Sequence, residues 1–380
     1  MALPYVRWDA AAGEFRAYED NDSGLTAFQV KWDDTYNRFR ILGNMLAPPG
    51  GVLGDNRKLA ANWVNSQGHF SINYSPIFAF DASLNNLWAS ASSISSLDLI
   101  FTGGKLYSAG VDLATLDCGV YDIYDALGHR LFSKYKSGAG YGAGYGIEVD
   151  ANGNVYVAGY VNDNKSVWKY DSAGVEQWSY YTGGNATGIE VDDAGNVYVT
   201  SARGTNGDGT FSVWKLNSSG AFVWGFDTGG MALEVKIDNS GDIIIGAITA
   251  GAGASAHQVY KLNSAGVEQW NADIDDSANG LAIDGSDNIY VAGGGASSKP
   301  VVKLNSGGVE QWNYDTGGTG QDIGLDSSGN VYVGDARGTN GDGTYTLWKL
   351  NSAGAFQAGF DTGYGLASLV IDNDIIYCGA

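Results

Sequence analysis

The stretch GIEVDDAGNVYVTSARGTNGDGTFSVWKLNSSGAFVWGFDTGG, residues 188–230, decides the fold. Val, Ile, Tyr, Phe and Trp are concentrated in four short segments: GIEV, NVYVTS, FSVWKL and AFVWGF. The gaps between them carry Asn-Gly, Asp-Gly and Ser-Gly pairs, which are typical of tight turns. We therefore expect four antiparallel strands in one meandering sheet. A lone sheet of this kind cannot cover both of its faces, so it requires neighbours like itself.

The unit recurs along most of the chain. An aromatic residue near its end falls at positions 88, 132, 178, 224, 270 and 312, in steps of 44, 46, 46, 46 and 42 residues, and Ala358 takes the seventh place. A second anchor, in the NVYV-like strand, also occurs seven times. Differences in length are confined to the loop between the second and third strands, as expected when a packed core cannot absorb insertions. Seven repeats of four strands predict an all-β, seven-bladed β-propeller.

The repeat also resembles known families. The pattern D-x-x-G-N-V-Y-V-x-G followed by V-W-K-L-N-x-x-G is similar to the bacterial seven-bladed propeller repeat. The segment GAFVWGFDTGG, residues 220–230, resembles the blades of pyrroloquinoline-quinone-type propellers. The resemblance covers roughly residues 77–380 and implies the fold. It implies little about function, because propellers host binding, scaffolding and catalysis alike.

The order of the segments predicts how the ring closes. Residues from 77 onward begin with a third and a fourth strand, whereas the carboxy terminus LASLVIDNDIIYCGA supplies a first and a second strand. One blade is then shared between the two ends, which removes two open sheet edges. A weak echo of a blade turn within residues 43–68 leaves eight blades as an alternative.

Residues 1–56 contain a smaller repeat, and we assign residues 57–380 to the propeller. VRWDAAAGEFR (6–16) and VKWDDTYNRFR (30–40) align position for position, and each is a plausible β-hairpin. Two hairpins form a small sheet only if something covers its apolar face. That cover could be the propeller itself or another subunit of an assembly. Pro-Pro-Gly-Gly at 48–51 indicates a linker after the module.

Charge and cysteine usage exclude several classes of protein. The net charge of −21 disfavours a nucleic-acid partner, which requires clustered Lys and Arg. Cys118 and Cys378 are the only cysteines, so no disulfide framework is expected. The amino terminus has no apolar stretch typical of a signal peptide, and no run is long enough to predict membrane insertion. We expect a virion location, with an extracellular or cytoplasmic one as the alternative.

Repeated polar residues have structural explanations. Asp at the head of each D-x-x-G turn, as in Asp150 and Asp192, is expected to cap the turn rather than bind a metal. The loop ARGTNGDGT, at 202–210 and 336–344, loosely suggests calcium but lacks the ligand spacing of such sites, so a long hairpin is favoured. Third-strand lysines recur near fourth-strand glutamates, as Lys169 does near Glu176, and we interpret them as cross-strand ion pairs.

No motif in the sequence supports an enzyme. The three histidines lie in different units, and no G-x-S-x-G, H-E-x-x-H or phosphate-binding loop is present. We expect no catalytic residues, no metal and no cofactor.

Sequence variation concentrates on one side of the predicted disc. The loops between the second and third strands and those between blades open on the same face and differ from blade to blade, whereas the D-x-x-G and N-S-x-G turns opposite are nearly constant. A rigid scaffold with variable loops is typical of a binding surface. Aromatic, acidic and amide side chains suit sugar rings. The candidate binding residues are Tyr181, Asn185, Asp275, Asp276, Gln321, Asp322 and Tyr364.

These observations favour a non-enzymatic structural or adhesion protein. The leading hypothesis is a bacteriophage virion component, such as a tail, fibre or capsid decoration protein. Its propeller would bind a host-surface glycan or protein, and its amino-terminal module would bind other virion proteins. The alternative is a carbohydrate-binding propeller released from a bacterium. A propeller oxidoreductase ranks third.

Overall fold

The computed structural model describes residues 5–9, 14–18, 24–33, 38–42, 75–84, 86–92, 94–112, 118–125, 130–136, 143–161, 165–248, 257–274, 277–294 and 299–380. The chain divides into two compact units, Met1–Leu59 and Ala60–Ala380. The stretch that offered an eighth blade, 43–68, lies outside the described residues. The boundary at 56/57 and the separate roles of the two units stay predictions.

The first unit contains one four-stranded antiparallel sheet. Its strands follow sequence order: β1 (Tyr5–Asp9), β2 (Glu14–Tyr18), β3 (Gly24–Asp33) and β4 (Arg38–Leu42). The two sequence repeats adopt the same pairing, because Trp8 lies opposite Phe15 just as Trp32 lies opposite Phe39. Both predicted hairpins are therefore present.

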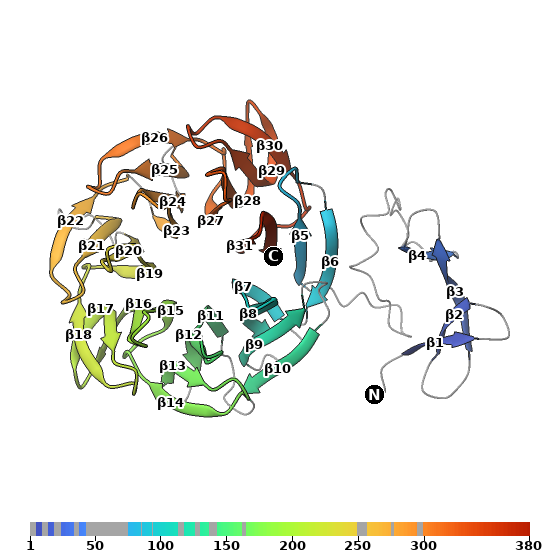
Figure 1. Cartoon of the computed structure of the whole chain (residues 1–380), viewed down its shortest axis with the longest axis horizontal. Coiled ribbons are helices and arrows are strands. Elements are labelled where there is room, and N and C mark those ends of the chain that lie inside the picture. The colour runs from blue at the N-terminus through green and yellow to red at the C-terminus, as the bar shows by residue number, and fades with distance from the viewer. Residues whose placement is uncertain are drawn as a thin grey trace. The chain divides into compact units, whose positions relative to one another are not determined.

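The second unit is a seven-bladed β-propeller, with its sheets arranged around a common centre (Figure 1). Blade 1 comprises β7 (Ile94–Thr102), β8 (Lys105–Asp112), β9 (Cys118–Asp125) and β10 (Arg130–Lys136). Blade 2 comprises β11 (Ala143–Val149), β12 (Val155–Val161), β13 (Lys165–Tyr170) and β14 (Glu176–Tyr180). Blade 3 comprises β15 (Ala186–Val191), β16 (Val197–Asn206), β17 (Gly209–Leu216) and β18 (Phe222–Phe226).

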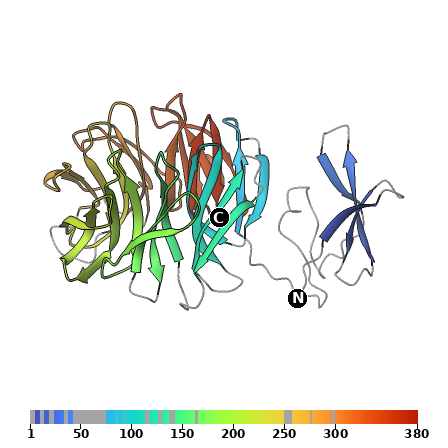
Figure 2. The ribbon, with the colours of Figure 1, turned by 60° about the horizontal axis from the view of Figure 1, so that its bottom comes forward.

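Blade 4 comprises β19 (Met231–Ile237), β20 (Ile243–Ile248), β21 (Val259–Leu262) and β22 (Glu268–Ala272). Blade 5 comprises β23 (Ala278–Ile283), β24 (Ile289–Gly293), β25 (Val301–Leu304) and β26 (Glu310–Tyr314). Blade 6 comprises β27 (Gly320–Leu325), β28 (Val331–Asn340), β29 (Gly343–Leu350) and β30 (Phe356–Phe360). The strands run between the two faces of the ring, as the tilted view shows (Figure 2).

Blade 7 is shared between distant parts of the chain, as the strand order predicted. It pairs β31 (Ser368–Asp372) and β32 (Ile375–Gly379) with β5 (Ser75–Phe80) and β6 (Asn86–Ser92). Cys378 on β32 lies opposite Phe78 on β5. The innermost strands β31 and β7 then contact each other, so the ring is closed.

The hydrophobic core lies between neighbouring blades rather than within one sheet. Tyr156 and Val167 of blade 2, for example, pack with Ile189, Val199 and Trp214 of blade 3, and all five are buried. Each sheet contributes residues from both faces to two such clusters. This is why a blade cannot be stable alone.

Aromatic residues on the outermost strands join each blade to the next. The Trp178 indole N–H donates to the carbonyl of Ser218 at 3.2 Å, and a β-carbon placed on Gly220 would lie 2.7 Å from the ring. Gly220 has φ of +82°, so it meets both the turn's backbone requirement and the close approach. We call this contact the Trp–Gly latch. The same close approach recurs at Phe132–Gly174, Trp224–Gly266, Trp270–Gly308 and Trp312–Gly354.

The Asp of each D-x-x-G turn is a turn cap, as predicted. The Asp150 carboxylate accepts the backbone N–H groups of Asn152 and Asn154, both at 2.9 Å, and the Tyr156 hydroxyl at 3.0 Å. Burial acts to raise the pKa of Asp150, but hydrogen bonds from Asn154 and Tyr156 outweigh it and lower that pKa. Asp192, Asp284 and Asp326 accept equivalent bonds.

The interpretation of the third-strand lysines as partners of fourth-strand glutamates was wrong. Lys169 lies 4.9 Å from the centre of the Tyr156 ring, whereas Glu176 pairs with Lys165 at 3.1 Å. The strand register explains the difference, because Lys169 lies opposite Trp178, whereas Glu176 lies opposite Tyr170. Lysines 215, 303 and 349 make the same cation–π contact with tyrosines 198, 290 and 332.

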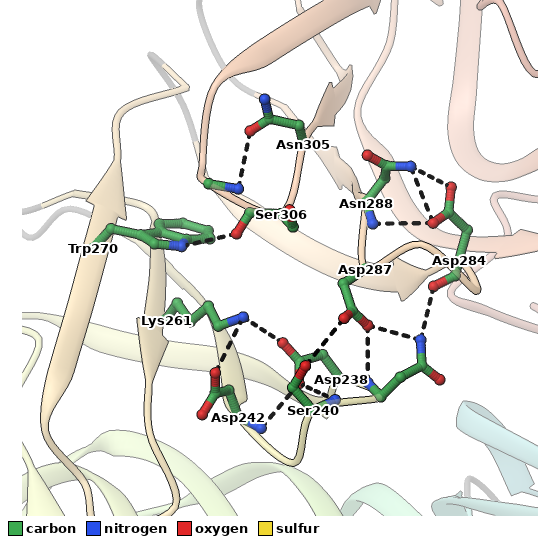
Figure 3. Close-up of polar contacts among 12 residues, drawn as sticks. Asp238, Ser240, Asp242, Lys261, Trp270, Asp284, Asp287, Asn288, Asn305 and Ser306 are labelled. Atoms are coloured by element: carbon green, nitrogen blue, oxygen red, sulfur yellow. Dashed lines mark hydrogen bonds and ion pairs between the residues drawn. The ribbon is translucent and has the colours of Figure 1, made fainter.

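Blade 4 departs from this pattern at one position, and its third-strand lysine has different partners. Ile244 replaces the tyrosine on the second strand, and Lys261 instead forms ion pairs with Asp238 at 2.6 Å and Asp242 at 3.2 Å (Figure 3). The Asp238 side chain is 1% exposed, so its charge depends on this partner.

We predict that Lys261→Met lowers the free energy of unfolding by about 3 kcal/mol, because it strands the buried Asp238 carboxylate. Lys303→Met is the matched control. Its ammonium lies 3.9 Å from Asp284, a carboxylate that Tyr290 and Asn288 already bind, and a loss of about 1 kcal/mol or less is expected. Chemical denaturation measures both, and equal losses would contradict the prediction.

We also predict that deleting residues 366–380 unfolds the ring instead of trimming it. The deletion removes β31 and β32 and leaves the β5 edge without its partner strand. Loss of the cooperative thermal transition is the expected result. A truncated chain that melts cooperatively near the intact protein would show that the ring does not depend on the shared blade.

Candidate functional site: the variable face and the central channel

The variable face is built by the loops between blades and by the hairpins between second and third strands. Two of these hairpins are the repeated ARGTNGDGT segments, in which β16–β17 and β28–β29 stay paired to their tips at Asn206–Gly209 and Asn340–Gly343. The expectation of a long hairpin at these loops is confirmed.

Each long hairpin is braced against the blade before it. The Tyr180 hydroxyl donates to the Asp208 carboxylate at 2.6 Å, and the Asn206 amide donates to the backbone carbonyl of Tyr181 at 2.6 Å. In the second copy the Tyr314 hydroxyl donates to Asp342, also at 2.6 Å. Burial, followed by the hydrogen bond to Asp342, raises the pKa of Tyr314 to about 12, so its hydroxyl stays a donor.

An ion pair fixes the base of each hairpin. The Arg203 guanidinium contacts both carboxylate oxygens of Asp227, at 2.6–3.0 Å, and Arg337 contacts Asp361 at 2.8 Å. Both arginines have positive φ, 33° and 82°, where the register of the hairpin shifts. The same strained position in two blades, held by the same ion pair, indicates one local structure used twice.

The described residues of the predicted binding site lie on two loops and on strand β27. Tyr181 and Asn185 lie between blades 2 and 3, and both are half-buried. Gln321 lies on the second residue of β27, and its amide donates to the Thr319 carbonyl at 3.4 Å. Tyr364 lies between blades 6 and 7 and is 40% exposed. Among the described residues, no hydrogen bond or ion pair joins these segments to one another.

Asp275 and Asp276 lie outside the described residues, as do most residues of three variable loops, 162–164, 249–256 and 295–298. The assignment of the binding residues stays a prediction.

Asp322 lies in the central channel instead of on a loop. The channel encloses about 440 Å³ and is lined by the innermost strands. At the strand position that Glu148, Glu190 and Lys236 occupy in blades 2 to 4, the other four blades carry uncharged residues: Ile100, Ala282, Gly324 and Val370. The charged residues are Asp98, Glu148, Glu190, Glu234, Lys236 and Asp322.

Two of these carboxylates tie neighbouring blades together. Asp98 accepts the backbone N–H of Ile147 in blade 2, and Asp322 accepts that of Leu369 in blade 7, at 2.8 and 2.7 Å. Lys236 pairs with Glu190 at 3.3 Å and with Glu234 at 3.4 Å. The channel thus holds five carboxylates around a single ammonium group.

Burial in the channel changes the pKa of these groups. It raises the pKa of Asp98, Glu234 and Asp322 to about 7 each, although Lys236 acts in the opposite direction. Burial, together with Glu190, raises the pKa of Glu148 well above its usual value. Burial lowers the pKa of Lys236, but Glu190 and Glu234 outweigh it and raise that pKa.

Sequence reasoning missed the channel apart from Asp322. The signal was present in the repeat, because IEVD at 147–150 and 189–192 and VKID at 235–238 place a charge inside an otherwise apolar strand. The innermost strand of a propeller borders the channel, which would have located them. Among the described residues, no group of three or more His, Cys, Asp or Glu side chains could hold a metal ion. The described part of the chain also has no helix long and apolar enough to cross a bilayer.

Comparison with known proteins supports the fold. No protein-family model matches the sequence, and no curated protein matches it significantly. The virginiamycin B lyase from Staphylococcus aureus, in an inactive form with quinupristin, is similar with a TM-score of 0.58 and 10% identity over 80% of this chain and 98% of that one. A computationally designed protein, Ika8, is similar with a TM-score of 0.50 and 13% identity over 76% and 81%.

A third neighbour is PorZ, an essential bacterial surface component of the type-IX secretion system of Porphyromonas gingivalis. Its TM-score is 0.56 at 14% identity, over 77% of this chain but 48% of that one. An enzyme, a designed protein and a secretion component share the architecture. At these identities the likeness shows the propeller fold alone.

We predict that the protein becomes less stable as pH rises from about 4 to about 7. Asp98, Glu234 and Asp322 have folded-state pKa values of about 7, above the value near 4 of an unfolded chain, so the folded state binds more protons across this window. A Tm about 3 °C higher at pH 5 than at pH 8 is expected in thermal scans.

Glu234→Gln is the control for that dependence. Its carboxylate pairs with Lys236 at 3.4 Å, so the change removes a titrating group with little loss of structure. We expect a higher Tm at pH 8 and a weaker pH dependence. A Tm that increases between pH 5 and pH 8 in the wild-type protein would overturn the explanation.

Proposed function

We propose that the protein is a non-enzymatic binding component that presents the variable face of its propeller to a surface glycan or protein. One observation carries this proposal: two copies of one hairpin project from that face, each braced by the same tyrosine, asparagine and arginine contacts. Braced loops lose little conformational entropy on binding, so their contacts contribute more fully to affinity. The repetition supports a ligand with repeated chemical groups.

The exposed surface of the hairpins favours a polar ligand. Thr205 and Thr210 join their hydroxyls at 2.8 Å, and Thr339 and Thr344 do so at 3.0 Å, all on exposed positions. These hydroxyls offer hydrogen bonds, and the exposed ring of Tyr364 on the same face offers an apolar contact, the combination that a sugar ring requires. The net charge of −21 favours a neutral glycan over an acidic one.

We propose further that the chain is a bacteriophage virion component, with residues 1–56 bound to other virion proteins. The separate amino-terminal sheet and the near-identical blades support this. A released bacterial lectin is the second candidate, which the threonine-lined hairpins would serve equally. Antibody labelling of purified phage particles from the source strain discriminates them, because only the first function predicts labelled particles.

We predict that Tyr181→Ala with Tyr364→Ala, and separately Thr205→Ala with Thr339→Ala, weaken binding by about tenfold on a glycan array or on isolated bacterial envelopes. Both pairs lie on the variable face, and their Tm should change little because the side chains are partly or largely exposed. Asp276→Ala, which changes another residue of the predicted site, should act in the same direction.

Glu176→Ala with Glu310→Ala is the matched control away from these loops. Each glutamate pairs with a lysine at 3.1 Å on the outer strands, and such surface pairs contribute little to stability. Binding should be unchanged in this variant. Equal loss of binding from the control, or no binding of the wild-type protein to either probe, would refute the variable face as the binding surface.

A further inference from the structure

The interface between blades 6 and 7, which closes the ring, exchanges the large and small residues of the Trp–Gly latch. On the outermost strand of blade 6, Ala358 lies opposite Lys349, just as Trp312 lies opposite Lys303 in blade 5. In the turn of blade 7 that faces it, Leu84 takes the place of the glycine. Its N–H donates to the Asp81 carbonyl at 2.9 Å, as that of Gly354 does to Asn351. A small residue thus meets a large one where elsewhere a large one meets glycine.

Leu84 occupies a conformation that leucine rarely adopts. Its φ is +62°, in the left-handed region, where the β-carbon of an L residue is strained against the backbone. Yet Leu84 is only 6% exposed and packs in a buried cluster with Phe80, against which Ala358 and Phe360 lie. The free energy gained by burying a leucine side chain offsets this backbone strain. The strained residue is therefore held by the space that the missing indole leaves.

The turn at this interface keeps hydrogen bonds although it has no indole. At the four described interfaces with a tryptophan, the indole N–H donates to the first carbonyl inside the turn, as Trp312 does to Ser352 at 3.2 Å. In one of them the third-strand lysine binds the same carbonyl, because Lys215 donates to Ser264 at 3.1 Å. At the closing interface the equivalent carbonyl, that of Ala82, accepts the Lys349 ammonium at 2.6 Å and the Tyr332 hydroxyl at 3.1 Å. The turn keeps its anchor although the tryptophan is absent.

We propose that Leu84 and Ala358 form a steric key that makes the terminal hairpin β5–β6 fit beside blade 6 and beside none of the latched blades. At each of the five described latches, a β-carbon at the glycine position would already lie 2.7–2.9 Å from the facing aromatic ring, so a leucine is excluded. A glycine turn placed beside Ala358 would leave a cavity of nearly an indole's volume. Leu84 is therefore excluded from the latched interfaces, and a glycine turn is disfavoured beside Ala358.

Such a key would prevent mispairing between similar repeats during folding. This role is independent of the proposed binding function. Consecutive blades have closely similar third and fourth strands, so β5–β6 could pair with the second strand of several blades during folding. The mismatch of Leu84 with every described latch penalises those pairings. The ring then closes at one position, and hence with one number of blades.

A double-mutant cycle tests the complementarity. Leu84→Gly creates a cavity and Ala358→Trp overpacks the site, and each should lower Tm by about 4 °C or more. The double variant restores the latch found elsewhere, and its Tm should return to within about 2 °C of the wild type. Losses that simply add would overturn the key.

Refolding from denaturant tests the selection itself. In the double variant every described interface accepts the same turn, so we expect at least a twofold lower yield of correctly closed monomer by size-exclusion chromatography, with misassembled species in its place. A yield equal to that of the wild type would show that the pair fills space without directing closure.

Introducing the same leucine and alanine at another interface provides a test that leaves the interface between blades 6 and 7 unchanged. Gly308→Leu alone should clash with Trp270, whose indole N–H donates to Ser306 (Figure 3). Adding Trp270→Ala should recover at least half of the lost Tm. If the second substitution lowers Tm further, aromatic size does not control what the turn accepts, and the proposal fails.

Discussion

The contact of an outer-strand aromatic with a turn glycine of the next blade is the constraint on which the propeller depends. It joins hydrophobic packing to a hydrogen bond, because the indole covers a glycine at positive φ while its N–H binds a carbonyl of the same turn. Only glycine both allows that backbone conformation and leaves room for the ring. The spacing of Trp and Gly in the repeat is therefore a requirement of the assembly, not only of the turn.

Two further layers of contact follow from this arrangement. Towards the centre, carboxylates such as Asp98 and Asp322 bind backbone N–H groups of the following blade, which holds the innermost strands together but concentrates negative charge in the channel. On the D-x-x-G face, Asp287 replaces the usual turn glycine at φ of 59° and accepts hydrogen bonds from Asn239 and Ser240 of blade 4 (Figure 3). Strain at one residue is again offset by contacts across a blade boundary.

The face that we propose for binding combines rigid and variable parts. Its hairpins are fixed by tyrosine, asparagine and arginine contacts that repeat in blades 3 and 6, whereas the neighbouring loops differ in length and sequence. Similar folds serve a lyase and a surface component of a secretion system, so the scaffold itself does not select a function. Function must come from these loops and from the channel.

The sequence by itself determined the strand order and the shared closing blade, and it favoured seven blades over eight. These follow from local periodicity, from turn residues such as Asp150, and from the count of strands at the two ends, none of which requires knowledge of contacts across the ring. Register could be counted because a period of two fixes which residues share a face.

Only the tertiary structure decided which side chains meet across blades. Third-strand lysines such as Lys169 contact tyrosine rings rather than glutamates. Where Ile244 replaces the tyrosine, Lys261 pairs with Asp238 instead. The pairing of Leu84 with Ala358 joins residues far apart in the chain, and the channel carboxylates come from five different repeats. The physical reason is that these contacts depend on how one sheet packs against its neighbour, and the strand pattern within a repeat does not encode that packing.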